Sequence, residues 1–235
     1  MRSIFYVGLW VIFSSMIQVG ISQPVQAQMV DSAIPSHIQQ DKNAQGEDLF
    51  LLFQDDFNDG DADGWTTYGL GTWSVINGEY VVDMGSGNSL LGYALAGNMD
   101  WTDYIFEADV NSIQGENKAI CFRCNDANSY FVNIVGNPYN LLLLGRGVDL
   151  FVTLYYPNTS GYWYHVKVIL MGANISVYVN DQMLINYTDS NTNWLKQGGI
   201  GVNGWTGAGT VDNVRFDNVI VRAIKPIHLP LITNP

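Results

Sequence analysis

The sequence predicts an all-β protein, folded as an antiparallel two-sheet β-sandwich of the jelly-roll type. Only 14% of the residues are charged, while the chain carries 24 glycines and 30 aromatic residues (7 Trp, 13 Tyr and 10 Phe). This composition favours strands and tight turns over helices. Apolar and polar residues alternate in many short runs, and turn residues separate these runs at roughly the 8–12-residue spacing of a sandwich. No window combines a helical period with helix caps.

The first 48 residues are expected to precede this domain. Arg2 is followed by an apolar stretch over residues 4–19 and by small residues up to Ala27, the pattern of a secretory signal cleaved near Ala27. A membrane anchor is the alternative, but the stretch is shorter than the ~20 residues that a span needs. Residues 28–48 are polar and aperiodic, as in a linker. We therefore predict a secreted chain with no membrane span after cleavage, a domain over residues 49–222 and a tail over residues 223–235.

Seven strands are predicted with most clarity, because each alternates with a period of two. In chain order they are Tyr80–Met84, Tyr104–Val110, Ala119–Asn125, Tyr130–Val135, Trp163–Leu170, Ile175–Asn180 and Thr210–Val221. Turn residues such as Asn77-Gly78 and Asn180-Asp181 separate them. Asp181 stands where glycine is usual, and aspartate tolerates the positive φ that such a turn needs.

A polar cluster is expected on one face of a sheet. If the turn at residues 115–117 closes a hairpin, core residues must pair with core residues, which sets Glu107 opposite Arg123. The next turn then places Arg123 near Phe131. Polar groups that bind hydroxyls, together with a ring that covers a sugar, suit a glycan; a solvated Glu107–Arg123 ion pair is the alternative. The predicted ligand-binding residues are Glu107, Asp109, Arg123, Phe131, Asn133 and Tyr139. Tyr139 is one of several aromatic residues, Trp205 among them, that are expected in or beside loops.

The order of motifs resembles the concanavalin A-like lectin/glucanase superfamily, and within it the laminin-G-like and 3-keto-disaccharide-hydrolase-like domains. The resemblance covers roughly residues 50–222. It implies a concanavalin A-like sandwich that either binds carbohydrate or acts on it, because the superfamily includes both. The motifs that carry it are Asp63-Gly64-Trp65, Tyr104–Val110, Cys121-Phe122-Arg123, Tyr162–Val168, Gly199–Val202 and Arg215–Val219.

An acidic cluster predicts calcium. Asp59-x-Asp61-x-Asp63-Gly64 matches the first half of a calcium loop. Leu70 stands where the last ligand of a helix–loop–helix site would be, which excludes that type of site. The resemblance implies instead a structural calcium between the first and last strands, at Asp56 and Asp217. The predicted Ca²⁺ ligands are Asp56, Asp59, Asp61, Asp63 and Asp217; a solvated acidic loop is the alternative.

The sequence offers little support for nucleic-acid binding, thiol chemistry or catalysis. The formal net charge of −12 argues against nucleic acid as a partner. Cys121 and Cys124, three apart on a strand, are expected to point to opposite faces roughly 10 Å apart and to stay free thiols. His165 alternates with core residues, and we expect it to be structural. Laminarinase-like members of the superfamily carry Glu-x-Asp-x-x-Glu, but Ser112 replaces the third acid here, so no catalytic residue is assigned.

The sequence thus predicts a secreted carbohydrate-binding or adhesion module with a structural calcium, whose partner is a polysaccharide or glycan. A glycoside hydrolase-like enzyme on the same fold, using Glu107 or Asp109, is the first alternative. A laminin-G-like protein-interaction domain is the second.

Overall fold

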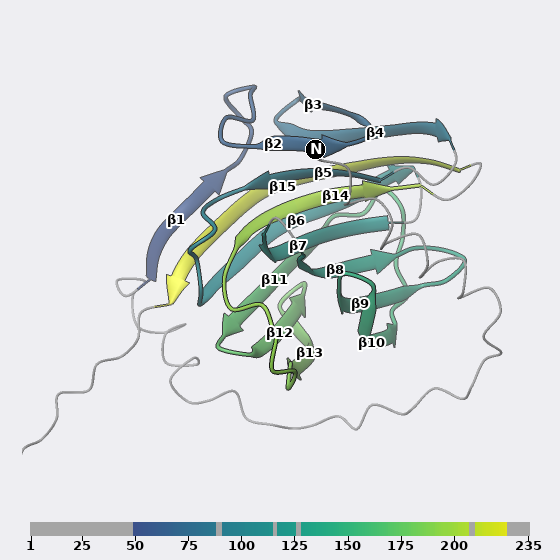
Figure 1. Cartoon of the computed structure of the whole chain (residues 1–235). Helices are drawn as coiled ribbons and strands as arrows, with labels where there is room; N and C mark the ends of the chain where they lie inside the picture. The colour runs from purple at the N-terminus through teal and green to yellow at the C-terminus, as the bar shows by residue number, and fades with distance from the viewer. Residues whose placement is uncertain (1–48, 88–90, 115–116, 126–127, 207–209, 225–235) are drawn as a thin grey trace, which may run out of the picture.

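The computed structural model describes residues 49–87, 91–114, 117–125, 128–206 and 210–224. These residues form two antiparallel sheets packed face to face, so the predicted sandwich is confirmed (Figure 1). Within the described ranges no helix is long and apolar enough to cross a membrane. The expected signal sequence, the linker and residues 225–235 of the tail lie outside the described residues.

Eight strands form the first sheet, sheet A: β1 (Leu49–Asp55), β3 (Thr72–Ile76), β4 (Glu79–Gly87), β6 (Tyr104–Gln114), β11 (Tyr164–Met171), β12 (Asn174–Val179), β13 (Gln182–Thr188) and β15 (Thr210–Ile224). Their order is β13-β12-β11-β6-β15-β4-β3, and β1 also pairs with β15.

Seven strands form sheet B: β2 (Thr66–Gly69), β5 (Leu91–Ala96), β7 (Asn117–Cys124), β8 (Tyr130–Val135), β9 (Leu141–Arg146), β10 (Asp149–Tyr155) and β14 (Gly199–Trp205). Their order is β10-β9-β8-β7-β14-β5-β2. In Figure 1 both sheets run from β2–β5 at the top to β9–β13 at the bottom.

The core lies between the sheets, and strand alternation decides which residues enter it. On β6, Tyr104, Phe106 and Ala108 are fully buried, while Glu107 between them is on the outer face. All seven strands predicted from alternation are present. The turn between β12 and β13 also forms as predicted, with Asn180 and Asp181 both at positive φ (50° and 64°).

The predicted pairing of β6 with β7 is wrong. β6 pairs with β11 and β15 in sheet A, whereas β7 pairs with β8 and β14 in sheet B. The chain therefore crosses from one sheet to the other between these strands. Alternation alone could not decide this, because the apolar faces of two strands meet equally well side by side in a sheet or across the core.

The register between β7 and β8 also differs from the prediction. Cys121, not Arg123, lies opposite Phe131, and Ala119 lies opposite Asn133. Arg123 has a φ of 47°, which takes it out of the extended conformation and ends the pairing with β8 at Phe122. The shift is two residues, so the outer face of β8 is still the one predicted.

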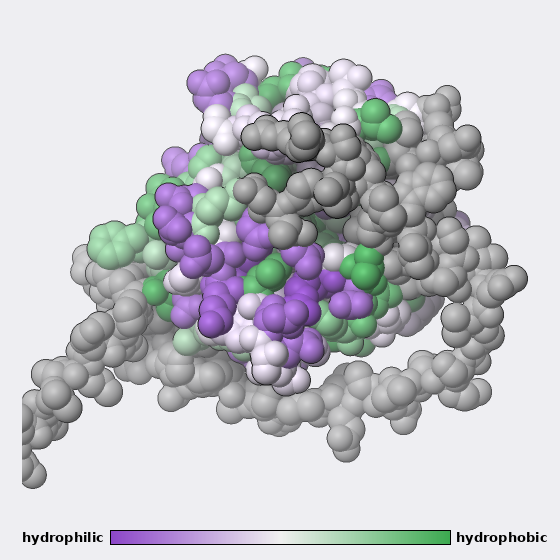
Figure 2. Space-filling view, viewed as in Figure 1, coloured by the Kyte–Doolittle hydropathy of each residue, from purple (hydrophilic) through white to green (hydrophobic). Residues whose placement is uncertain are grey.

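One end of the sandwich is polar. Figure 2 shows hydrophilic side chains gathered over β12 and β13. The polar segment 189–193, which follows β13, is tied to sheet B by the buried Asp189. Its carboxylate accepts a hydrogen bond from the Tyr130 hydroxyl at 2.6 Å and pairs with Arg146 at 3.1 Å. Since a buried carboxylate is tolerated only when it is paired, these contacts fix the segment in place.

Candidate functional site

A pocket lies on the outer face of sheet B. Strand pairing sets one row of outward residues across five strands: Tyr93 on β5, Asn203 on β14, Ala119 on β7, Asn133 on β8 and Leu143 on β9. All five line the pocket. They share a face because each alternates with an inward core residue on its own strand.

In the next row of outward residues, a glycine leaves space for the ring of Phe131. Gly201 pairs with Cys121, which pairs with Phe131, which pairs with Gly145. The Phe131 ring lies over Gly145 so closely that a Cβ there would be 2.6 Å from its edge. Together with Trp205 at the end of β14, the rings of Phe131 and Tyr93 line this pocket.

Three amides add hydrogen-bonding groups. Asn133 Nδ2 donates to Asn117 Oδ1 at 2.9 Å, and Asn117 Nδ2 donates to the Trp205 carbonyl at 3.4 Å. These bonds fix the orientation of both amides. The buried Oδ1 of Asn203 has no hydrogen-bond partner in the described part of the chain. A buried acceptor of this kind favours a donor from a ligand or from water.

The lining is uncharged. Among the described residues that line the pocket, all are apolar, aromatic, amide or hydroxyl-bearing, with the one thiol of Cys121. Rings can cover the apolar face of a sugar, while amides exchange hydrogen bonds with its hydroxyls. The pocket therefore suits a neutral sugar better than an acidic one.

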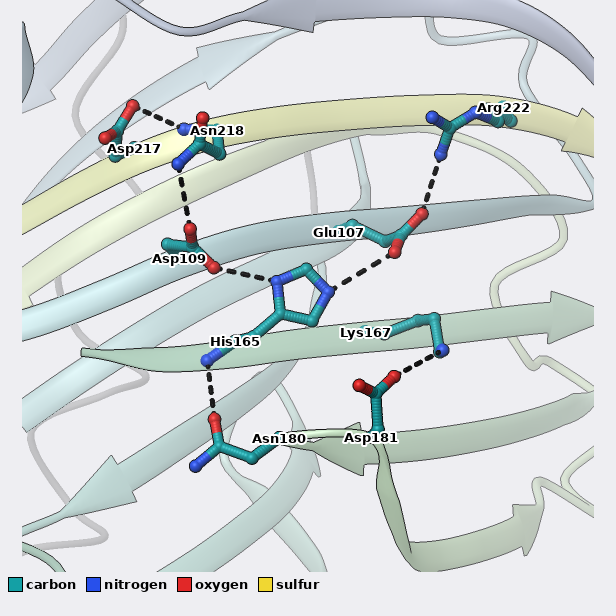
Figure 3. Close-up of polar contacts among 9 residues, drawn as sticks. All are labelled: Glu107, Asp109, His165, Lys167, Asn180, Asp181, Asp217, Asn218 and Arg222. Atoms are coloured by element: carbon teal, nitrogen blue, oxygen red, sulfur yellow. Dashed lines mark hydrogen bonds and ion pairs between the residues drawn. The ribbon is translucent and has the colours of Figure 1, made fainter.

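A second polar cluster lies on the outer face of sheet A, on the other side of the sandwich (Figure 3). His165 on β11 stands between the two carboxylates of β6, with Nδ1 2.7 Å from Asp109 and Nε2 3.3 Å from Glu107. Arg222 donates to the other oxygen of Glu107 at 2.7 Å, and Asn218 donates to the other oxygen of Asp109 at 2.9 Å. Every carboxylate oxygen of the pair is thus engaged.

These contacts determine the charges of the cluster. Hydrogen bonds to Asp109 and Glu107 raise the pKa of His165 to about 9, so it is a cation at neutral pH. The hydrogen bond from His165 lowers the pKa of Glu107. Burial acts to raise the pKa of Asp109, but hydrogen bonds from His165 and Asn218 outweigh it and the pKa is lowered. Both carboxylates are therefore ionised.

A pair of ionised carboxylates lacks the proton donor that a glycosidase needs. That reaction requires one carboxylic acid that holds a proton through a raised pKa, beside a second carboxylate. Glu107 and Asp109 both have lowered pKa values and share one histidine. This arrangement favours an ion-pair cluster that stabilises sheet A over an acid–base pair.

A family model described as a 3-keto-alpha-glucoside-1,2-lyase-like domain matches residues 52–222. The chain belongs to this family. The match confirms the resemblance to 3-keto-disaccharide-hydrolase-like domains, and we use "the lyase-like domain" for the matched part of the chain.

Curated relatives match only in part. An extracellular exo-alpha-L-arabinofuranosidase of Streptomyces chartreusis is 29% identical over 156 residues, which are 63% of this chain and 18% of that enzyme. An uncharacterised protein of Methanocaldococcus jannaschii is 32% identical over 127 residues, which are 51% of this chain and 55% of that protein. The chain thus spans about half, or less, of the curated relatives that it matches.

Solved structures share the fold of the lyase-like domain. The carbohydrate-binding module CBM66 of Bacillus subtilis has a TM-score of 0.57 at 23% identity, covering 68% of this chain and 96% of the module. The laminarinase catalytic domain of Thermotoga petrophila has a TM-score of 0.58 at 12% identity, covering 76% and 99%. The fold is therefore one that carbohydrate-binding modules and glycosidases both use.

The predicted ligand-binding residues do not form one site in the lyase-like domain. Phe131 and Asn133 line the pocket on sheet B, whereas Glu107 and Asp109 lie on the outer face of sheet A. Arg123 is fully buried and donates to the carbonyls of Thr102 and Leu195, so its predicted place on the sheet face is wrong. Tyr139 is half exposed in the β8–β9 connection and is not among the pocket residues.

Most of the residues that line the pocket are not among those predicted from the sequence. Asn203 and Tyr93 were not predicted, and Trp205 was placed only among rings in or beside loops. The run Gly201-Val202-Asn203-Gly204-Trp205 did carry a signal, because Val202 is apolar and its neighbours are small, polar or aromatic. Read with a period of two, that run presents Asn203 and Trp205 on the same face.

Four of the predicted calcium ligands, Asp56, Asp59, Asp61 and Asp63, lie in the loop after β1, and Asp217 lies on β15. Asp56, Asp59 and Asp61 each accept a hydrogen bond from the backbone two residues on, which stabilises the loop locally. In the ranges that the structure describes, no three His, Cys, Asp or Glu side chains are grouped to hold a metal ion. Burial, followed by the nearby carboxylates of Asp109, Glu79 and Asp56, raises the pKa of Asp217. Calcium binding therefore stays a prediction from the sequence.

Proposed function

We propose that this domain is an extracellular carbohydrate-binding module, and that it holds a neutral sugar in the pocket on sheet B. The observation that carries the proposal is the lining of that pocket, with the rings of Tyr93, Phe131 and Trp205 beside the amides of Asn133 and Asn203 and no charged side chain among the described lining residues. The shared fold with carbohydrate-binding modules supports it. The secretory pattern at residues 1–27 and the extracellular arabinofuranosidase relative support export.

Titration calorimetry with neutral oligosaccharides of glucose, galactose and arabinose tests the proposal. We expect Phe131→Ala to weaken binding about fivefold, because one ring on a sugar contributes on the order of 1 kcal/mol. Tyr155→Ala is the matched control, since Tyr155 is a 73% exposed ring on β10 outside the pocket. Equal losses in both variants, or binding that is unchanged in Phe131→Ala, would place the sugar elsewhere.

A glycoside-active enzyme is the second candidate, supported by the similarity to the arabinofuranosidase and by the paired carboxylates of β6. It predicts release of reducing sugar from a polysaccharide and loss of that release in both Glu107→Gln and Asp109→Asn. No release, together with sugar binding that survives both substitutions, would reject it. Absence of both binding and release would favour a laminin-G-like protein-interaction domain.

We further propose that a calcium ion stabilises the fold and is not part of the sugar site. A cation between Asp56 and Asp217 would relieve the repulsion that these carboxylates exert on each other. It would link the loop after β1, the first strand, to β15, the last strand. Its test is thermal unfolding, described in the Discussion.

A further inference from the structure

The two cysteines of the chain meet, contrary to the sequence prediction. Cys121 and Cys124 are the only cysteines in the sequence, and their Sγ atoms are 2.9 Å apart. Both side chains are buried and both are free thiols. On a regular strand, residues three apart point to opposite faces, so the backbone between them must depart from the extended form.

Arg123 makes that departure. Its φ of 47° is in the left-handed region, which a side-chain-bearing residue adopts only where its surroundings hold it. The Tyr104 hydroxyl accepts a hydrogen bond from its backbone N–H at 2.8 Å. Its buried guanidinium donates to the carbonyls of Thr102 and Leu195 at 3.0 and 2.9 Å. The fold therefore keeps the two sulfurs together without help from a covalent bond.

The two thiols differ in what they face. Both are almost fully buried, but Cys121 is among the residues that line the pocket on sheet B, whereas Cys124 is not. Gly201 lies beside Cys121, and a Cβ at Gly201 would be only 2.7 Å from the sulfur. Gly201 is thus closely packed against the Cys121 sulfur and the Leu95 side chain. A small molecule in the pocket therefore meets Cys121 and not Cys124.

We propose that Cys121 and Cys124 are a modification site, at which a small disulfide such as oxidised glutathione oxidises the pair to an intrastrand disulfide. Nothing in this proposal depends on sugar binding. The sulfurs need to approach by only about 0.9 Å, from 2.9 Å to the ~2.05 Å of a disulfide bond. An exported protein meets compartments in which such a bond persists.

The exchange proceeds in two steps. The Cys121 thiol loses its proton to solvent, and its thiolate attacks one sulfur of oxidised glutathione; the glutathione S–S bond breaks and one glutathione thiolate leaves. Cys124 then loses its proton and attacks the Cys121 sulfur of the mixed disulfide, which expels the second glutathione. Two protein thiols are oxidised to one disulfide, and one glutathione disulfide is reduced to two thiols. Burial and the neighbouring Cys121 raise the pKa of the Cys124 thiol, which is consistent with Cys121 as the first nucleophile.

Intact-mass spectrometry of the folded full chain after incubation with excess oxidised glutathione tests the proposal. We expect the wild-type monomer to lose two hydrogen atoms and, when it is then unfolded in urea, to show no site of alkylation by iodoacetamide, with both changes reversed by dithiothreitol. In Cys124→Ser we expect one glutathione to stay bound at Cys121, because the second thiol is missing. In Cys121→Ser we expect Cys124 to react at least about tenfold more slowly than Cys121 does in Cys124→Ser, because Cys124 does not line the pocket and its pKa is raised.

Two results would overturn the inference. The first is a wild-type chain that is treated while folded and is then alkylated at both thiols once it is unfolded in urea, while a chain unfolded before treatment oxidises under the same conditions. The second is oxidation that yields only disulfide-linked dimers. Since the wild-type measurement needs no substitution, the proposal can be tested even if a variant fails to fold. Either result leaves the sugar-binding proposal untouched.

Discussion

The His165 cluster makes the stability of the domain depend on pH. His165 has a pKa of about 9 in the folded chain, against about 6.5 when unfolded. A group with a raised folded pKa stabilises the fold fully below its unfolded pKa, and this contribution falls as pH rises through the folded pKa. The stabilisation is therefore complete below about pH 6.5, decreases between about 6.5 and 9, and is absent at pH 10.

The size of this effect follows from the same values. A change in pKa from 6.5 to about 9 corresponds to about 3 kcal/mol. The His165 side chain is 36% exposed, so screening by solvent reduces the contribution to about 1–2 kcal/mol. We expect the free energy of unfolding of His165→Gln to be lower than that of the wild type by about this amount at pH 6 and equal to it at pH 10.

Urea unfolding of both proteins at pH 6, 8 and 10 measures this difference. Thr72→Ala is the control, because Thr72 is an exposed residue on β3 of the same sheet, which β4, β15 and β6 separate from the strand of His165. The difference between wild type and Thr72→Ala is expected to be the same at each pH. A difference for His165→Gln that is constant, or that grows with pH, would refute the ion-pair account of the cluster.

Three further predictions concern the pocket, the polar end and the aspartates. Gly145→Ala should displace both the Phe131 ring, which would lie 2.6 Å from the new Cβ, and the Asp149 backbone carbonyl, which would lie closer still; calorimetry should show weaker sugar binding, and the free energy of unfolding should fall by about 1–3 kcal/mol. Asp189→Ala should lower the free energy of unfolding by about 3–5 kcal/mol in urea, because it leaves the buried Arg146 without its partner; a loss below about 1 kcal/mol would contradict this. Calcium should raise the melting temperature relative to chelator, and Asp217→Ala should abolish that rise; equal temperatures with calcium and with chelator would reduce residues 55–63 to a solvated loop.

Local pattern was sufficient to predict the strands and their faces. The alternation in Tyr104–Val110 identified the core residues of β6, and Asn180-Asp181 identified the β12–β13 turn, because both depend only on neighbours in the sequence. Partner choice depends on the whole sandwich. Glu107 was therefore assigned to the right face of its own strand but to the wrong sheet neighbour, which led to an incorrect pairing with Arg123.

One backbone angle accounts for most of the remaining errors. The left-handed Arg123 ends the pairing with β8 at Phe122, turns its own side chain into the core and brings Cys121 to Cys124. Its causes lie far along the chain, in Tyr104 and Leu195. Arginine has no intrinsic preference for this conformation, so the sequence near it holds no signal. Most of the pocket was missed for a related reason, since β5 and β14 join β7 and β8 only in the folded sheet.

Amide chemical shifts measured by NMR during an oligosaccharide titration test most directly whether sugar binds to sheet B. We predict shifts concentrated on β7, β8 and β14, around Phe131 and Asn203, with little change on sheet A. Shifts concentrated on β6 and β11, around Glu107 and His165, would contradict it and would move the site to the opposite face of the sandwich.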